Sequence, residues 1–146
     1  MSYEEVFTVH VNIKKTIELK NDDGDSVVMI SFTGNVSGKY FNGVVLDGAI
    51  DTQIIGNVGD RHTLSARYML EGKDQTGEVC RIYIENNGDF HNQWNDASFR
   101  TFPKIVTNSK ALSFLNHELF VGKGVQTEVG VDIIIYRSTK IQNVNI

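Results

Sequence analysis

Residues 7–20 alternate between apolar and polar side chains with a period of two. One parity is apolar and is interrupted only by Lys15; it holds Phe7, Val9, Val11, Ile13, Ile17 and Leu19. The other parity is polar from Thr8 to Lys20. A helix with this pattern would spread its apolar residues around every side, whereas a strand collects them on one face. The segment therefore predicts a long β-strand with one buried face.

The rest of the chain continues in short strand-like runs separated by turn residues. The runs are Val27–Thr33, Val44–Leu46, Ile50–Ile55, Thr63–Glu71, Val79–Asn86, Phe99–Thr107, Leu119–Val121 and Val131–Arg137. A hairpin turn is predicted at Asn21–Asp25. Pro103 predicts that the strand Phe99–Thr107 lies at a sheet edge or is bulged at that residue. One short helix is predicted after Ser109, with Ala111, Leu112, Phe114 and Leu115 closing one end of the sheet.

Many short strands with few helices predict a single all-β domain over residues 1–146. The strands must bury their edges, and closure into an antiparallel barrel does this most completely. Gly34, Gly38 and Gly43 would allow the sharp bends that barrel corners need. A two-sheet β-sandwich is the alternative.

Composition excludes several classes of protein. The net charge is −4 and Lys14–Lys15 is the only adjacent basic pair, which argues against nucleic acid or an acidic membrane surface as partner. Cys80 is the only cysteine, so no disulfide within the chain and no cysteine metal cluster can form. No apolar run approaches the roughly 20 residues of a membrane helix, and the first residues lack a signal-peptide pattern. We therefore expect a cytoplasmic protein.

Several segments, in order, resemble the uncharacterised bacterial family of proteins with domain of unknown function 3237. They are Ser37-Gly38, Phe41–Leu46, Asp51–Gln53, Leu64–Tyr68, Ile82–Gly88, Phe99–Pro103, Leu115-Asn116, Leu119–Gly122 and the closing Val131 to Tyr136. The resemblance covers roughly residues 5–137 and implies a small lipocalin-like barrel. It carries over no catalytic role, because the family has no established general activity.

Three consecutive predicted strands each have one apolar and one polar parity. The polar parities carry Asp51, Gln53, Arg67, Arg81, Tyr83 and Glu85. If these face the barrel interior, Asp51 and Arg67 should lie in contact and hold a ligand oxygen, with Glu85 as the reserve partner. Tyr83 or Glu85 would then move a proton, while Gln53 and Arg81 would bind the ligand. The alternative is a solvated outer face with cross-strand ion pairs, and alternation alone does not decide between them.

A long predicted loop, Asn86–Ser98, is the second candidate for binding. Its Asn86, Phe90 and Trp94 would contact a ligand at an opening of the barrel. The alternative is an aromatic plug that packs over the barrel end.

Other chemistry has weaker sequence support. The four histidines form no close pair, so neither a metal site nor a cofactor is expected. A Ser-His-Asp triad stays open, because triads are recognised by geometry rather than by sequence order. Cys80 shares the apolar parity of its strand and is predicted to be a buried structural thiol.

Two functions remain open at this stage. The first is a barrel that binds a small, partly apolar molecule, with or without cofactor-independent acid–base catalysis of the isomerase, cyclase or hydratase type. The second is a non-catalytic interaction module that acts through its surface or a dimer interface. Two-fold homodimers are the commonest assemblies, which favours a homodimer over a monomer.

Overall fold

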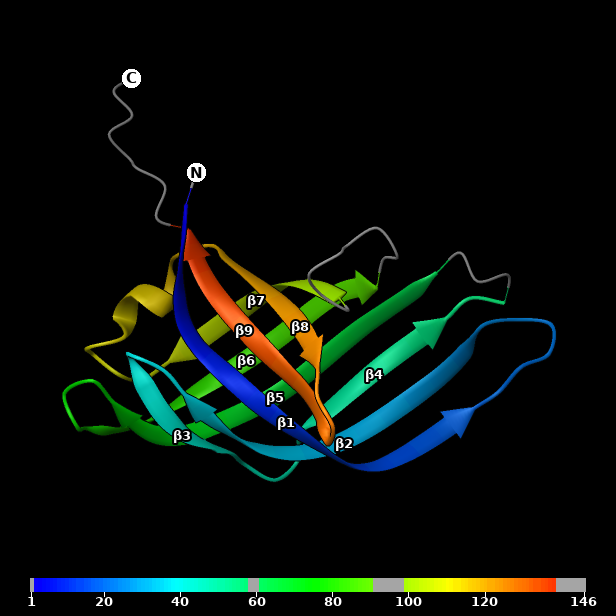
Figure 1. Cartoon of the computed structure of the whole chain (residues 1–146), viewed down its shortest axis with the longest axis horizontal. Helices are drawn as coiled ribbons and strands as arrows, with labels where there is room; N and C mark the ends of the chain where they lie inside the picture. The colour runs from blue at the N-terminus through cyan, green and yellow to red at the C-terminus, as the bar shows by residue number, and fades with distance from the viewer. Residues whose placement is uncertain (1, 58–60, 91–98, 139–146) are drawn as a thin grey trace, which may run out of the picture.

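The computed structural model describes residues 2–57, 61–90 and 99–138, and most of them lie in β-strands (Figure 1). The elements are β1 (Tyr3–Leu19), β2 (Ser26–Ser37), β3 (Phe41–Val45), β4 (Ile50–Ile55), β5 (His62–Asp74), β6 (Val79–Phe90), β7 (Phe99–Thr107), the short 3-10 helix η1 (Ser113–Asn116), β8 (Phe120–Gln126) and β9 (Gly130–Ser138). No helix in these ranges is long and apolar enough to cross a membrane.

The strands close into an antiparallel barrel, which confirms the predicted fold and excludes the sandwich. From β5 to β9 each strand pairs with the next along the chain, and β1 pairs with both β9 and β2. The short strands β3 and β4 share one position in the ring, because each of them pairs with both β2 and β5. The ring therefore has no free end in the described sheet, as Figure 1 shows.

Alternate side chains of every strand fill the barrel interior. Fully buried positions include Phe7, Val9, Phe41, Leu70, Ile82, Ile84 and Ile135. Cys80 is 4% exposed within this core, as predicted, and burial raises the pKa of its thiol. The thiol is therefore kept in its neutral, unreactive form.

The first strand departs from the predicted single buried face. Val9 and Val11 are buried, but Ile13, Ile17 and Leu19 are 45–59% exposed. Two features explain this. A register shift after Ile13 reverses the parity, and β9 pairs with β1 only as far as Asn12. Beyond that point β1 stays paired with β2 but has no strand on its other side.

The predicted helix is shorter than expected and begins later. Only the four residues of η1 are helical. Ser109 nevertheless organises this segment: its hydroxyl accepts the N–H of Leu112 at 3.1 Å and donates to Asp74 at 2.7 Å. Leu112 and Leu115 are buried and help close one end of the barrel, as expected.

Pro103 lies where β7 has a free edge, as its sequence predicted. The strand pairs with β8 only from Phe99 to Thr101, although it pairs with β6 along its whole length. Proline has no backbone N–H to donate, so it is tolerated where a neighbouring strand is missing.

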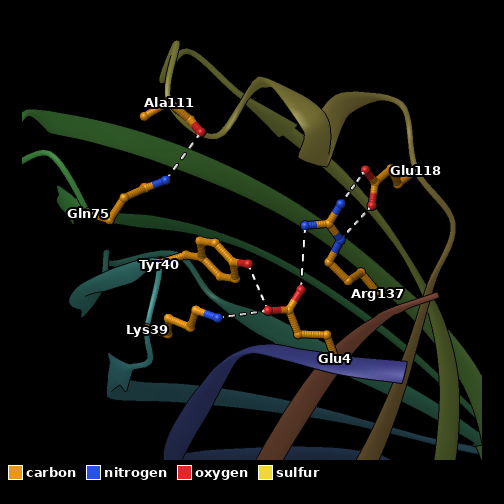
Figure 2. A network of polar contacts seen from close by, with 7 residues as sticks. All are labelled: Glu4, Lys39, Tyr40, Gln75, Ala111, Glu118 and Arg137. Atoms are coloured by element: carbon orange, nitrogen blue, oxygen red, sulfur yellow. Dashed lines mark hydrogen bonds and ion pairs between the residues drawn. The ribbon is translucent and has the colours of Figure 1, made fainter. Parts of the chain in front are cut away.

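A cluster of charged residues ties the start of β1 to the end of β9 (Figure 2). Glu4 accepts hydrogen bonds from Lys39 at 3.0 Å and Tyr40 at 2.8 Å, and these bonds hold the pKa of its carboxyl below the usual value. Arg137 lies 3.5 Å from Glu4 and makes a two-point contact with Glu118, with both N–O distances at 2.8 Å. The guanidinium group of Arg137 thus joins the barrel to the η1 segment.

We predict that Arg137→Met lowers the free energy of unfolding by about 1–3 kcal/mol, because it leaves two partly buried carboxylates without their partner. Arg137 is only 24% exposed. Arg61→Met is the matched control, since Arg61 pairs with Asp25 while 52% exposed and should cost no more than about 0.5 kcal/mol. Urea denaturation measures both; equal losses in the two variants would contradict a structural role for the cluster.

Candidate functional site

Strand register places Asp51 inside the barrel. On β4, Asp51 lies opposite Ile30 of β2 and Ala66 of β5. Ala66 is 3% exposed and belongs to the core. Residues directly opposite each other on antiparallel strands share one face, so Asp51 also faces the interior.

The predicted contact between Asp51 and Arg67 is wrong. Arg67 lies opposite Ile50 and Glu85, on the outer face. It is 64% exposed and pairs with Glu85 at 3.1 Å. The alternation within β5 correctly separated polar Arg67 from apolar Ala66. The register between β4 and β5, however, places the polar residues of β4 on the same side of the wall as the apolar residues of β5, so Asp51 and Arg67 lie on opposite sides.

The remaining residues of that predicted polar face are divided between the two sides of the wall. Arg81 is outside and pairs with Glu71 at 2.9 Å. Tyr83 lies opposite Met69, so it also faces outward and is half-buried. Gln53 shares the interior parity of Asp51. The structure therefore brings Asp51 and Gln53 together and separates them from Arg67, Arg81, Tyr83 and Glu85.

A cavity of about 70 Å³ lies in the barrel beside Asp51. Its walls are mainly apolar and include Val11, Ile30, Phe32, Leu64, Phe99, Val131 and Ile133, with Gln53, Asn86 and Asp51 as the polar members. Ile13, which is 45% exposed, forms part of its rim. A water occupies about 30 Å³ in the liquid, so the enclosed part has room for roughly two waters or one functional group.

A chain of hydrogen bonds leads from the cavity to the start of β5. The side-chain amide of Gln53 donates to Asp51 Oδ2 at 2.9 Å. Its oxygen therefore faces His62, and His62 Nε2 lies 2.8 Å from it. Because that oxygen is an acceptor, Nε2 of His62 carries the proton. The ring of His62 stacks on Phe90 with 3.8 Å between centroids.

Burial shifts the pKa values of these groups toward their neutral forms. Burial raises the pKa of the Asp51 carboxyl, although hydrogen bonds from Gln53 and the Ser65 backbone oppose the shift. Burial also lowers the pKa of His62 and raises that of the Tyr68 hydroxyl. Tyr68 thus stays protonated and can donate a hydrogen bond, while Asp51 is a carboxyl whose proton is held more tightly than usual.

Three buried side chains around Ala66 have polar atoms without a partner. In the described parts of the chain, Asp51 Oδ1, the Tyr68 hydroxyl and both amide atoms of Asn86 make no hydrogen bond. Asp51 and Asn86 lie opposite Ala66 on its two sides, and Tyr68 is the next interior residue of β5. An unsatisfied buried polar group costs about 1–3 kcal/mol, so this grouping is unfavourable unless water or another molecule supplies the missing hydrogen bonds.

The predicted loop from Asn86 is wrong at its beginning. Asn86 is 0% exposed in the middle of β6, and Phe90 ends that strand. Trp94 and the rest of 91–98 lie outside the described residues.

Sequence reasoning missed His62 and Tyr68 as residues of the site. Both share the interior parity of Leu64 and Ala66, which is the signal that could have identified them.

These features define a small antiparallel barrel with a polar group buried in its lumen. The family model described as a protein of unknown function, DUF3237, matches residues 1–138, and the chain belongs to this family. A UPF0311 protein of Clostridium acetobutylicum is 36% identical, with 83% of this chain and 84% of that protein covered.

Solved structures share the fold over most of their length. A protein of unknown function from Clostridium acetobutylicum is 30% identical with a TM-score of 0.77, covering 94% of this chain and 96% of that one. A β-barrel-like protein from Acinetobacter baumannii has 19% identity and a TM-score of 0.70, with 93% and 94% covered. An enzyme from Penicillium herquei has 14% identity and a TM-score of 0.69, with 93% and 92% covered.

We predict that Asp51→Asn changes how stability depends on pH. The raised pKa of Asp51 means that, above the ordinary value of 3.8, the folded state holds a proton that the unfolded state has released. Wild-type stability should therefore fall as pH rises through this window and stay lower above it, and the variant should lack that loss. The advantage of the variant over wild type should be larger at pH 7 than at pH 4 in urea denaturation.

Asp47→Asn controls for the loss of one negative charge, because Asp47 is exposed in the turn before β4. If Asp51→Asn and Asp47→Asn give parallel pH profiles, the buried state of Asp51 is contradicted.

Proposed function

We propose that this protein binds a small, neutral, partly apolar molecule carrying a carbonyl oxygen, and that Asp51 transfers a proton to or from it. The observation that carries the proposal is the group of unpaired buried polar atoms on Asp51, Tyr68 and Asn86. Asp51 Oδ1 provides a proton acceptor, and the Tyr68 hydroxyl and the Asn86 amide provide two hydrogen-bond donors. All three side chains lie around one small residue, Ala66.

The chemistry follows from which of these groups donate and which accept. A carbonyl oxygen of the ligand would accept hydrogen bonds from the Tyr68 hydroxyl and the Asn86 amide. These donors stabilise the negative charge that forms on the oxygen when a neighbouring carbon loses its proton. Asp51 takes that proton, and its raised pKa suits a carboxyl that must also return it. Isomerisation, cyclisation and hydration all fit this exchange without a cofactor.

Gln53 and His62 act on Asp51 rather than on the ligand. The Gln53 amide holds Oδ2 of the carboxylate, which leaves Oδ1 directed to other partners. His62 in turn fixes the orientation of the Gln53 amide. They are positioning residues in this proposal.

The size and lining of the cavity limit the ligand. About 70 Å³ takes the reacting group and the carbons attached to it. The rest of a larger molecule would lie at the rim against Ile13 and Val131, which favours an apolar remainder. An enzyme from Penicillium herquei has the same fold, which supports a barrel of this kind as a host for catalysis.

The competing function is an interaction surface or a homodimer contact on the outer wall. Phe102 and Leu119 are 71% and 83% exposed beside a groove of about 630 Å³ at the free edge of β7. Exposed apolar side chains around a groove are typical of partner-binding surfaces. This alternative predicts binding outside the barrel.

A titration with cyclopentanone, followed by amide chemical shifts in NMR, tests the site. We expect shifts confined to the strands around Ala66. Ala66→Leu should abolish them because it fills the cavity, and Arg67→Met should leave them unchanged because Arg67 is outside. Shifts that instead centre on Phe102 and Leu119 would favour the interaction surface, and the absence of any shift would count against lumen binding.

Hydrogen–deuterium exchange at the α-carbon of the same ketone tests the catalytic step. Asp51→Asn should slow exchange by at least about 100-fold, the usual contribution of a general base. Asp47→Asn should not change the rate. Binding without exchange above the buffer rate would restrict the function to binding.

A further inference from the structure

Three side chains on the outer wall of the barrel form a linked hydrogen-bonded set. His10 Nδ1 lies 2.9 Å from Asp132 Oδ1, and His10 Nε2 lies 2.8 Å from Ser37 Oγ. The residues come from β1, β9 and β2, three strands that lie side by side in Figure 1. None of them belongs to the lumen site.

The strand register explains why these residues meet. His10 lies directly opposite Asp132 on β9, and on its other side it lies opposite Asn35 of β2. Ser37 is two residues beyond Asn35 and therefore on the same face of β2. The neighbours of His10 in β1, Val9 and Val11, are buried, so all these side chains point outward.

The connections match those of a serine nucleophile, a histidine base and an orienting carboxylate. The carboxylate of Asp132 can only accept a hydrogen bond, so His10 Nδ1 must be the donor. The proton of the neutral His10 ring therefore lies on Nδ1. Nε2 is then the acceptor, and the Ser37 hydroxyl donates to it. This is the tautomer that a general base needs in order to take the serine proton.

A groove of about 410 Å³ is lined by His10 and Asp132 but not by Ser37, which adjoins it through the hydrogen bond to His10. The other side chains that form it include Asn12, Asn35, Val44 and Val129, and no further charged residue lines it. Val44 and Val129 are 49% and 62% exposed. A neutral substrate with a small apolar group fits this lining better than an ion.

Asn35 is the group placed to stabilise an oxyanion. It lies directly opposite His10 and two residues before Ser37 on the outer face of β2, where its side chain is exposed. An amide N–H near the nucleophile can donate to the negative oxygen of a tetrahedral intermediate.

We propose that Ser37, His10 and Asp132 form an acyl-transfer site that hydrolyses neutral carboxylic esters with a short acyl group. The Ser37 oxygen attacks the ester carbonyl while its proton passes to His10 Nε2. The intermediate expels the alcohol, which takes that proton, and leaves an acyl group on Ser37. Water then attacks the acyl carbon, gives one proton to His10, and releases the carboxylic acid as that proton returns to Ser37.

Two measurements on the intact chain test this proposal. The first is covalent labelling by a fluorophosphonate, located by mass spectrometry of peptides. The second is hydrolysis of p-nitrophenyl acetate, with the acyl intermediate trapped by acid. We expect a single label on Ser37, lost in Ser37→Ala. Labelling and hydrolysis should both fall by at least about 100-fold in His10→Gln and by a smaller factor in Asp132→Asn and Asn35→Ala.

Matched variants separate this chemistry from simple surface reactivity. Ser31→Ala removes another serine of β2, and His117→Gln removes an exposed histidine that could attack the nitrophenyl ester by itself. Neither should change labelling or hydrolysis. Circular dichroism checks that each variant is folded.

The proposal is overturned if Ser37 is unlabelled, or if Ser37→Ala hydrolyses the ester as fast as wild type. In either case the three residues are a polar cross-strand contact only. Because the lumen is on the opposite side of the wall, Asp51→Asn should leave labelling of Ser37 unchanged. A negative result for Ser37 labelling or ester hydrolysis therefore leaves the proposed function of the lumen site untouched.

Discussion

The structure depends on closure of the ring through β1. This strand pairs with β2 on one side and with β9, the last strand, on the other. Register shifts in the described pairings occur only in β1, and each has a consequence. The shift between Glu5 and Phe7 lets the consecutive residues Val6 and Phe7 both be fully buried. The shift after Ile13 turns the strand outward where β9 ends. Closure leaves the ring without a free end and creates an interior that water does not fill freely.

Closure also determines the chemistry of the lumen. Asp51 would be an ordinary carboxyl on an open sheet, but inside the barrel burial raises its pKa. The small side chain of Ala66 leaves space between Asp51 and Asn86, where larger residues would have filled the core. Buried polar atoms without partners lower stability, and several of them lie around Ala66. Departures from good packing of this kind are typical of functional sites.

The two faces of the barrel wall carry different chemistry because side chains alternate along a strand. In β1, Val9 and Val11 complete the core while His10, between them, meets Ser37 and Asp132 outside. The inner site is small and mainly apolar, and burial raises the pKa of its carboxyl. The outer set is accessible, with His10 42% exposed, and is arranged as a nucleophile with its base. The polar groups of the lumen site lie on β4, β5 and β6, whereas the outer set lies on β1, β2 and β9, so the two sites share no polar residue.

The sequence by itself determined most of the strands, the all-β class and the burial of Cys80, because a period of two and the turn residues between runs are local properties. It favoured a closed barrel but left a sandwich open, because closure is not a local property. It also indicated Asp51 and Gln53 as polar residues of one strand face. It did not determine that Asp51 faces inward and Arg67 outward, since a shift of one residue between β4 and β5 exchanges the faces that meet. Nor could it bring His10 to Asp132, which is 122 residues away in the chain. Those contacts were decided only by the tertiary structure, because register and ring closure depend on the packing of the whole core.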